Sequence, residues 1–289
     1  EAQEYVEAAA VFEELTVKHA QHELAPEALL MAGLSRLMAD DNEAAMQLLR
    51  EVARRYPKLP LAEDADYWLG MAHSFNGDHE ECREHLGAHL KKFSKSGRYT
   101  SAAIFRRAYC RFMLADYEGA IAEFDDYLRE HPEAADIHEA RVLRGDALAA
   151  LGKIDAALES YAEVPEDAGH WFEEAHFKTG KIFKLRRDWP ALRAHFDAFI
   201  AGHPQSMRLA EAVYWAGVAC IEQEQPEEAR RLYWDALARH GNEARHHGVE
   251  DILLALPRLY RGEDARVERL RETQRVRSRA EKDKHTVLA

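Results

Sequence analysis

The sequence predicts an all-α fold, an α–α superhelix of about six full helix pairs with a half repeat at each end. Two observations lead to this fold class. Glycine and proline are few, 15 and 9 in 289 residues, and charge is spread along the chain, as in helices joined by short turns. A small residue, here called the marker, also recurs at spacings of 37, 38, 37, 35 and 37 residues, which is typical of a repeat array. The six markers are Gly33, Gly70, Ala108, Gly145, Gly180 and Gly217.

Each marker is followed at fixed offsets by two further residues. Twelve positions on comes a small residue, with one exception at Leu192, and four positions later comes a large apolar or aromatic residue. The residues at the first offset are Ala45, Cys82, Ala120, Ala157, Leu192 and Ala229, and those at the second are Leu49, Leu86, Phe124, Tyr161, Phe196 and Tyr233. Because the agreement extends over several independent offsets and most of the chain, it indicates one structural unit repeated.

Each unit is predicted to be two antiparallel helices. The first carries the marker, a tight turn follows about seven residues later, and the second carries the small and large residues on one face. Prolines then end the second helix at Pro57, Pro132 and Pro204, because proline cannot donate to the helical hydrogen-bond ladder. We expect the small residues to let the two helices approach closely and the large residue to fill the space between units.

This pattern resembles the tetratricopeptide repeat over roughly residues 1–262. Tyr56-Pro57 and the run Asp66-Tyr67-Trp68-Leu69-Gly70 are similar to bacterial cell-envelope members, such as the Tol-associated periplasmic cell-division coordinator and the outer-membrane assembly lipoprotein. The resemblance implies a bacterial periplasm or cell envelope, with the cytoplasm as the alternative. The chain departs from the family at Arg107 and Arg111, which stand where apolar residues are usual, and at Leu192.

The two ends of the chain depart from the full repeat. By register with Ala45 and Leu49, residues 1–22 are predicted to be the second helix of a truncated repeat, which suggests a piece of a longer protein. Residues 23–244 hold the six repeats. Residues 245–289 are predicted to form a degenerate seventh repeat, with a first helix at 249–261, and a charged C-terminal helix.

Composition and motifs argue against several functions. The net charge of −13 disfavours nucleic acid, and no apolar run is long enough for insertion into a membrane. No nucleophile elbow, phosphate loop, His-Glu-x-x-His or dinucleotide fingerprint is present, so we expect neither an enzyme nor a cofactor. The densest histidine group, around Cys82, His85 and His89, has a spacing that could hold zinc. However, Cys82 takes the small slot of its repeat, so a core cysteine beside solvated histidines is favoured over a metal site.

The remaining candidates concern partner binding. The family resemblance implies that residues three before, one after and four to five after each marker face a concave groove, although apolar residues there could equally pack between helices. The candidates on these helices are Tyr67, Met71, Phe75, Phe105, Tyr109, Phe112, Asp146, Phe177, Lys181, Lys184 and Tyr214. Arg107 and Arg111 lie one helical turn apart and are predicted either to bind partner carboxylates or to pair within the chain. The asparagines that clamp chaperone tails in the family are missing.

These patterns together favour a non-enzymatic protein–protein interaction scaffold. The expected ligand is an extended peptide or a partner helix, held in a concave groove rich in aromatic residues. An alternative is a structural spacer or assembly module of a larger multidomain envelope protein. A metal-binding or enzymatic protein is a more remote alternative. The patterns do not specify an oligomeric state.

Overall fold

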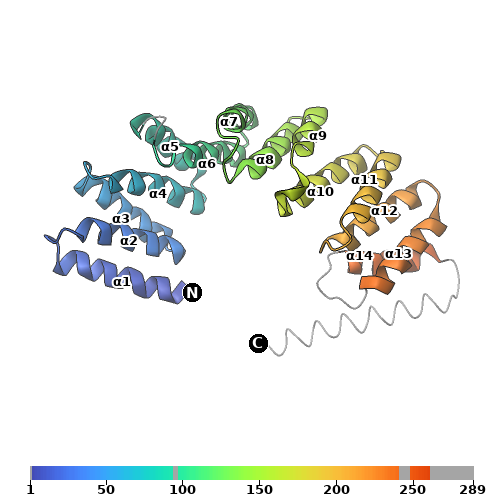
Figure 1. Ribbon diagram of the computed structural model, residues 1–289, viewed down its shortest axis with the longest axis horizontal. Helices are drawn as coiled ribbons and strands as arrows, with labels where there is room; N and C mark the ends of the chain where they lie inside the picture. Colours follow the sequence, from blue (N-terminus) through green and yellow to red (C-terminus); the bar gives the residue numbers. More distant parts are fainter. Residues whose placement is uncertain (1, 94–96, 241–247, 261–289) are drawn as a thin grey trace. The chain divides into compact units, whose positions relative to one another are not determined.

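The computed structural model describes residues 2–93, 97–240 and 248–260, which are helical apart from turns and connections and contain no strand (Figure 1). The predicted all-α solenoid of helix pairs is thereby confirmed. The chain forms two compact units, residues 1–175 and 176–289. The predicted charged helix at 263–284 lies outside the described residues.

The first unit contains a single helix followed by four helix pairs. The single helix is α1 (Ala2–Lys18), and the first helices of the pairs carry the markers. The pairs are α2 (Ala25–Met38) with α3 (Asn42–Arg55), α4 (Leu61–Phe75) with α5 (His79–Phe93), α6 (Thr100–Met113) with α7 (Tyr117–Glu130), and α8 (Ile137–Ala150) with α9 (Ile154–Ala162). A short 3₁₀ helix, η1 (Glu166–Ala168), precedes α10 (His170–Leu185), within which the second unit begins.

The second unit continues the same arrangement. It holds most of α10 and then α11 (Trp189–Gly202), α12 (Leu209–Glu222), α13 (Pro226–His240), α14 (Val249–Ala255) and η2 (Leu256–Leu259). The helix expected at 249–261 is shorter than predicted, because the α-helix ends at Ala255 and Pro257 lies in the 3₁₀ turn. Proline within an α-helix would remove a hydrogen bond and clash with the preceding turn.

The marker glycines mark the closest approach within each pair. A Cβ atom added to Gly70, Gly145, Gly180 or Gly217 would lie 2.2–2.5 Å from the large residue on the second helix of the same pair. Such a separation is well inside van der Waals contact. The large residue therefore fills the space against its own marker, whereas the pattern alone predicts that it lies between units.

The turns inside the pairs share one backbone geometry. The residue seven positions after each marker has a left-handed conformation, with φ between 55° and 83°. Glycine occupies this position in two turns, and residues with a side chain occupy it in the other four. The six residues are Asp40, Gly77, Ala115, Gly152, Arg187 and Glu224. A residue in this left-handed conformation commonly follows the end of a helix. Here it lets the chain reverse direction within a three-residue turn.

Successive first helices contact one another in the first unit, where α2 meets α4, α4 meets α6 and α6 meets α8. No comparably extended contact joins successive second helices among the residues described. The most extensive contacts between neighbouring pairs join the second helix of one pair to the first helix of the next, as in α3 with α4, and the first helices add contacts with one another on the first-helix side of the stack. In helical repeats this side offers the extended binding surface.

Candidate functional site

Four of the predicted binding residues are buried and pack between helices. Tyr67 lies under the ring of Tyr99, with centroids 4.2 Å apart and planes nearly parallel, and Phe105 lies 5.6 Å from Tyr127. These contacts stabilise the repeats and leave the side chains no area for a partner. The residues concerned are Tyr67, Met71, Phe105 and Phe177. An apolar residue on a first helix has the same spacing whether it faces a groove or a neighbouring helix, so the pattern could not separate the two.

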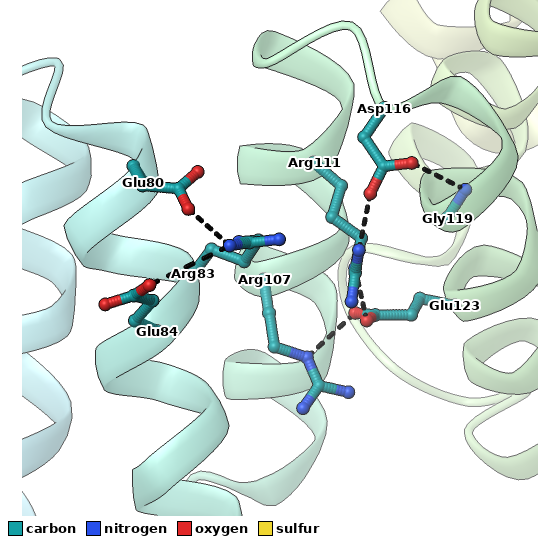
Figure 2. A network of polar contacts seen from close by, with 8 residues as sticks. All are labelled: Glu80, Arg83, Glu84, Arg107, Arg111, Asp116, Gly119 and Glu123. Carbon is teal, nitrogen blue, oxygen red and sulfur yellow. Dashed lines mark hydrogen bonds and ion pairs between the residues drawn. The ribbon is translucent and has the colours of Figure 1, made fainter.

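Arg107 and Arg111 are paired within the protein (Figure 2). The Nε atom of Arg107 donates to Glu123 Oε2 at 2.9 Å, and that of Arg111 donates to Glu123 Oε1 at 2.6 Å. Arg111 also binds Asp116, whose pKa is lowered by this hydrogen bond. The intramolecular interpretation of these arginines is therefore the one that the structure supports, and they join α6 to α7.

Glu123 is expected to be the residue on which this network depends, because its side chain is only 14% exposed and bridges both guanidinium groups. Glu123→Gln should lower the free energy of unfolding by about 1–2 kcal/mol, since it removes one charge-assisted bond and weakens another. Urea unfolding followed by circular dichroism measures the change. Glu118→Gln, on the exposed face of the same helix, is the control, and equal midpoints for the two variants would contradict the assignment.

Two further candidates of the first unit also have partners inside the chain. Asp146 accepts a hydrogen bond from the hydroxyl of Tyr161 at 2.7 Å. The Tyr161 ring lies on the marker of the same repeat, so Asp146 supports this packing. Phe112 is half buried, with its ring 5.7 Å from that of Tyr117.

The candidates of the second unit lie along α10 and α12. Lys181 and Lys184 are exposed, and the Nζ atom of Lys184 lies 4.1 Å above the ring of Trp215. Tyr214 is half buried. Its ring centroid lies 6.3 Å from that of Tyr233, and the two ring planes are nearly parallel. A lysine over a tryptophan face is a favourable cation–π contact, so Lys184 has a structural partner of its own.

The histidines beside Cys82 are not solvated, contrary to expectation. His89 is buried, and its Nδ1 atom lies 2.9 Å from Asp66 Oδ2, while His85 Nε2 lies 2.9 Å from the backbone oxygen of Asp66. These contacts tie α5 to α4. Cys82 instead faces Cys110. Among the described residues, no group of three histidine, cysteine or acidic side chains is placed to hold a metal ion.

Arg106 differs from the paired arginines on the same helix. Its guanidinium carbon lies 5.7 Å from the ring centroid of Phe75 and 5.1 Å from that of Tyr109. No carboxylate of the described residues lies within ion-pair distance of it, and its Nε atom is buried without a hydrogen-bond partner. Burial raises the pKa of nearby Glu139, and the charge of Arg106 opposes this effect. A half-buried cation between two rings thus retains the capacity to bind an anionic group.

Exposed apolar side chains lie at equivalent positions of the first helices α2, α4 and α6. Met38, Phe75 and Met113 are each the fifth residue after a marker and are 47–48% exposed. Met31 holds the same position as Arg106, two before the marker, and is also exposed. Because these positions are seven residues apart, they share one face of each first helix. We call this set the methionine–aromatic face; it comprises Met31, Met38, Phe75, Arg106, Tyr109 and Met113.

Only part of this face was open to prediction. Phe75 and Tyr109 follow from the family offsets, whereas Met31 and Arg106 stand two residues before the marker, a position that those offsets omit. The position could be found from its spacing, since it lies one helical turn before the residue that follows the marker. The spacing does not show which of the arginines on α6 lacks an ion pair with a carboxylate.

Comparisons with known proteins agree with this architecture. Two family models described as tetratricopeptide repeat match residues 27–58 and 114–170. No curated protein matches the chain in sequence. None of the described helices is long and apolar enough to cross a membrane.

Solved structures similar to the chain share its fold at low sequence identity. A tetratricopeptide repeat protein from Parabacteroides merdae has 17% identity and a TM-score of 0.54, over 86% of this chain and 97% of its own. The apo form of the quorum sensor NprR from B. thuringiensis has 16% identity and a TM-score of 0.56, over 92% and 82%. The apo form of RapI has 10% identity and a TM-score of 0.66, over 94% and 84%. The chain therefore carries tetratricopeptide repeats at residues 27–58 and 114–170 and shares the fold of solved tetratricopeptide repeat proteins.

Proposed function

We propose that the chain is a non-enzymatic scaffold that binds an extended peptide or a partner helix on the methionine–aromatic face of its first unit. The observation that carries this proposal is Arg106, held between Phe75 and Tyr109 without a carboxylate partner in the described part of the chain. The favoured ligand has a carboxylate that meets Arg106 and apolar side chains on either side of it.

The physical chemistry of the face suits such a ligand. A guanidinium flanked by rings has lost much of its freedom before binding, so less entropy is lost when it accepts a carboxylate. The planar group can also donate two parallel hydrogen bonds. The methionines at Met31, Met38 and Met113 are flexible and polarisable, which lets them fit apolar side chains of varied shape.

The wider context of the proposal comes from the fold and from one motif. Repeat proteins of this fold are generally non-catalytic scaffolds, and a stack of helix pairs provides an extended binding surface. The run Asp66-Tyr67-Trp68-Leu69-Gly70 supports a place in the bacterial periplasm or cell envelope, with the cytoplasm as the alternative. The acidic net charge of −13 disfavours nucleic acid as the partner.

Selection from a displayed library of random linear peptides tests the function. Peptides enriched on the wild-type chain should carry an aspartate, a glutamate or a free C-terminus beside apolar residues. Arg106→Gln and Phe75→Ala should each raise the dissociation constant of these peptides about tenfold or more, because both remove a group at the centre of the contact. Arg54→Gln is the matched control, since Arg54 is an exposed arginine on the second helix α3.

The carboxylate requirement has its own readout. Replacing the acidic residue of an enriched peptide by its amide should weaken binding to the wild-type chain but not to Arg106→Gln. If the amide and acid peptides bind equally well to the wild-type chain, Arg106 is not the anchor. If enriched peptides bind Arg106→Gln and Phe75→Ala as tightly as the wild type, the methionine–aromatic face is not the binding surface.

A further inference from the structure

Cys82 and Cys110 meet at the junction between two helix pairs. Cys82 lies on α5, the second helix of one pair, and Cys110 lies on α6, the first helix of the next. Their Sγ atoms are 2.6 Å apart, both side chains are fully buried, and both thiols are free. From the sequence alone, three separate core cysteines are expected, because these two are 28 residues apart.

The repeat geometry explains why the two sulfurs meet. Cys82 stands twelve residues after one marker, and Cys110 stands two residues after the next. The same two positions hold Ala45 and Ala72 at the preceding junction, where both are fully buried in one cluster. They hold Ala120 and Ala147 at the following junction, where both are again fully buried. The architecture therefore buries both positions at each of these junctions, and only at this one does the sequence place a thiol at both.

The surroundings of the two thiols favour thiol–disulfide chemistry. The hydrogen bond between the sulfurs, with further hydrogen bonds to His79 and Ser74, lowers the pKa of Cys110. The same hydrogen bond, together with burial, raises the pKa of Cys82. In the closed junction the Cys110 thiol therefore loses its proton more readily than the Cys82 thiol does.

We propose that Cys82 and Cys110 form a reversible disulfide that joins α5 to α6 across the junction between the second and third helix pairs. The oxidant is a low-molecular-weight disulfide. The Cys110 thiolate attacks one of its sulfurs, forming a mixed disulfide and releasing one thiolate. Cys82 then loses its proton and attacks the Cys110 sulfur, which forms the Cys82–Cys110 bond and releases the second thiolate. Two electrons pass from the cysteines to the oxidant, and the two protons pass to the released thiols.

Because both sulfurs are buried, the oxidant cannot reach them in the closed junction. The oxidant reaches them while α5 and α6 are apart, either during folding or during local opening of the junction. Once formed, the bond closes a loop between cysteines 28 positions apart in the sequence and holds the two pairs together. The fold and the disulfide should therefore stabilise each other.

Equilibration of the full chain in reduced and oxidised glutathione tests the proposal. Samples are held under native conditions and in urea, quenched with acid, alkylated, and mapped by mass spectrometry. We expect a Cys82–Cys110 crosslink whose equilibrium constant is about tenfold or more larger in the folded chain than in urea. The Cys220→Ala variant should behave as the wild type, because Cys220 lies on α12 in the other unit.

Two variants keep the test independent of folding defects. Cys82→Ala and Cys110→Ala install the residue that neighbouring junctions already hold, so both should fold and both should lose the crosslink. The proposal is overturned if all three thiols of the wild type stay alkylatable at equilibrium, or if the crosslink forms no more favourably in the folded chain than in urea. A crosslink that involves Cys220 would overturn it as well. Peptide binding plays no part in these readouts.

Discussion

Replacing Tyr161 by alanine should lower the free energy of unfolding by about 3–5 kcal/mol. The ring is buried on α9 and lies where a Cβ atom on Gly145 would be only 2.4 Å away. Removing it leaves a cavity between α8 and α9 and also removes the hydrogen bond to Asp146. Because units of a repeat array contact only their neighbours, the loss should concentrate in this pair and the pairs beside it. Hydrogen exchange of α8 and α9, together with urea unfolding, measures both its size and its location.

The conservative variant separates the ring from its hydroxyl. Tyr161→Phe keeps the ring on the marker and should cost only about 1 kcal/mol, which is typical of one lost hydrogen bond. Similar losses for the two variants would show that the hydroxyl, and not the fit of ring to glycine, stabilises the pair.

The second unit should lose stability in acid through His176. Its ring stacks on that of His195, with centroids 3.6 Å apart. Burial lowers the pKa of His176 to about 3; the charges of His195, His203 and Arg208 act in the same direction, and the hydrogen bond with His195 opposes them. The unfolded chain, with a histidine pKa near 6.5, therefore binds a proton more readily than the folded chain does. Stability is fully present above about pH 6.5 and falls as the pH drops toward about 3.

Replacing His176 should make the free energy of unfolding of the second unit less dependent on pH. In His176→Phe the aromatic contacts remain, but no proton is taken up on unfolding. We expect the difference in unfolding free energy between pH 7 and pH 4 to shrink by about 2 kcal/mol, which is less than full linkage because the ring keeps some contact with water. Urea unfolding at several pH values gives the comparison. His22→Gln, at an exposed histidine, is the control, and an unchanged pH profile in His176→Phe would rule out this origin of acid sensitivity.

The helix pairs were predictable because their signals are local. The marker, the small residue and the large residue are set by contacts inside one pair, and the turn follows at a constant distance. The helices before Pro57 and Pro132 end at Arg55 and Glu130, two residues earlier in each case, which agrees with the effect of proline on the preceding backbone.

The candidate site was less predictable because it depends on contacts between pairs. Asp66 binds histidines 19 and 23 residues away, which spacing along a single helix does not reveal. Arg107 and Arg106 are adjacent in sequence, yet Glu123 pairs with the first, and only aromatic rings flank the second. Tyr67 is predicted to face the groove, but in the structure Tyr99 from the next pair stacks on its ring. Each outcome depends on the partner that the fold brings near.

The shared left-handed turn makes each helix pair a hairpin of the same geometry, which could be exchanged as a unit. From marker to small residue the distance is always twelve, because the same three-residue reversal joins the helices of each pair. The variation in repeat length, from 35 to 38 residues, therefore falls after the small residue, where the second helices themselves differ in length: α9 has 9 residues and α11 has 14. Recombination at a connection would move an intact hairpin to a new neighbour, whereas a cut inside a hairpin would destroy the geometry that all six turns share.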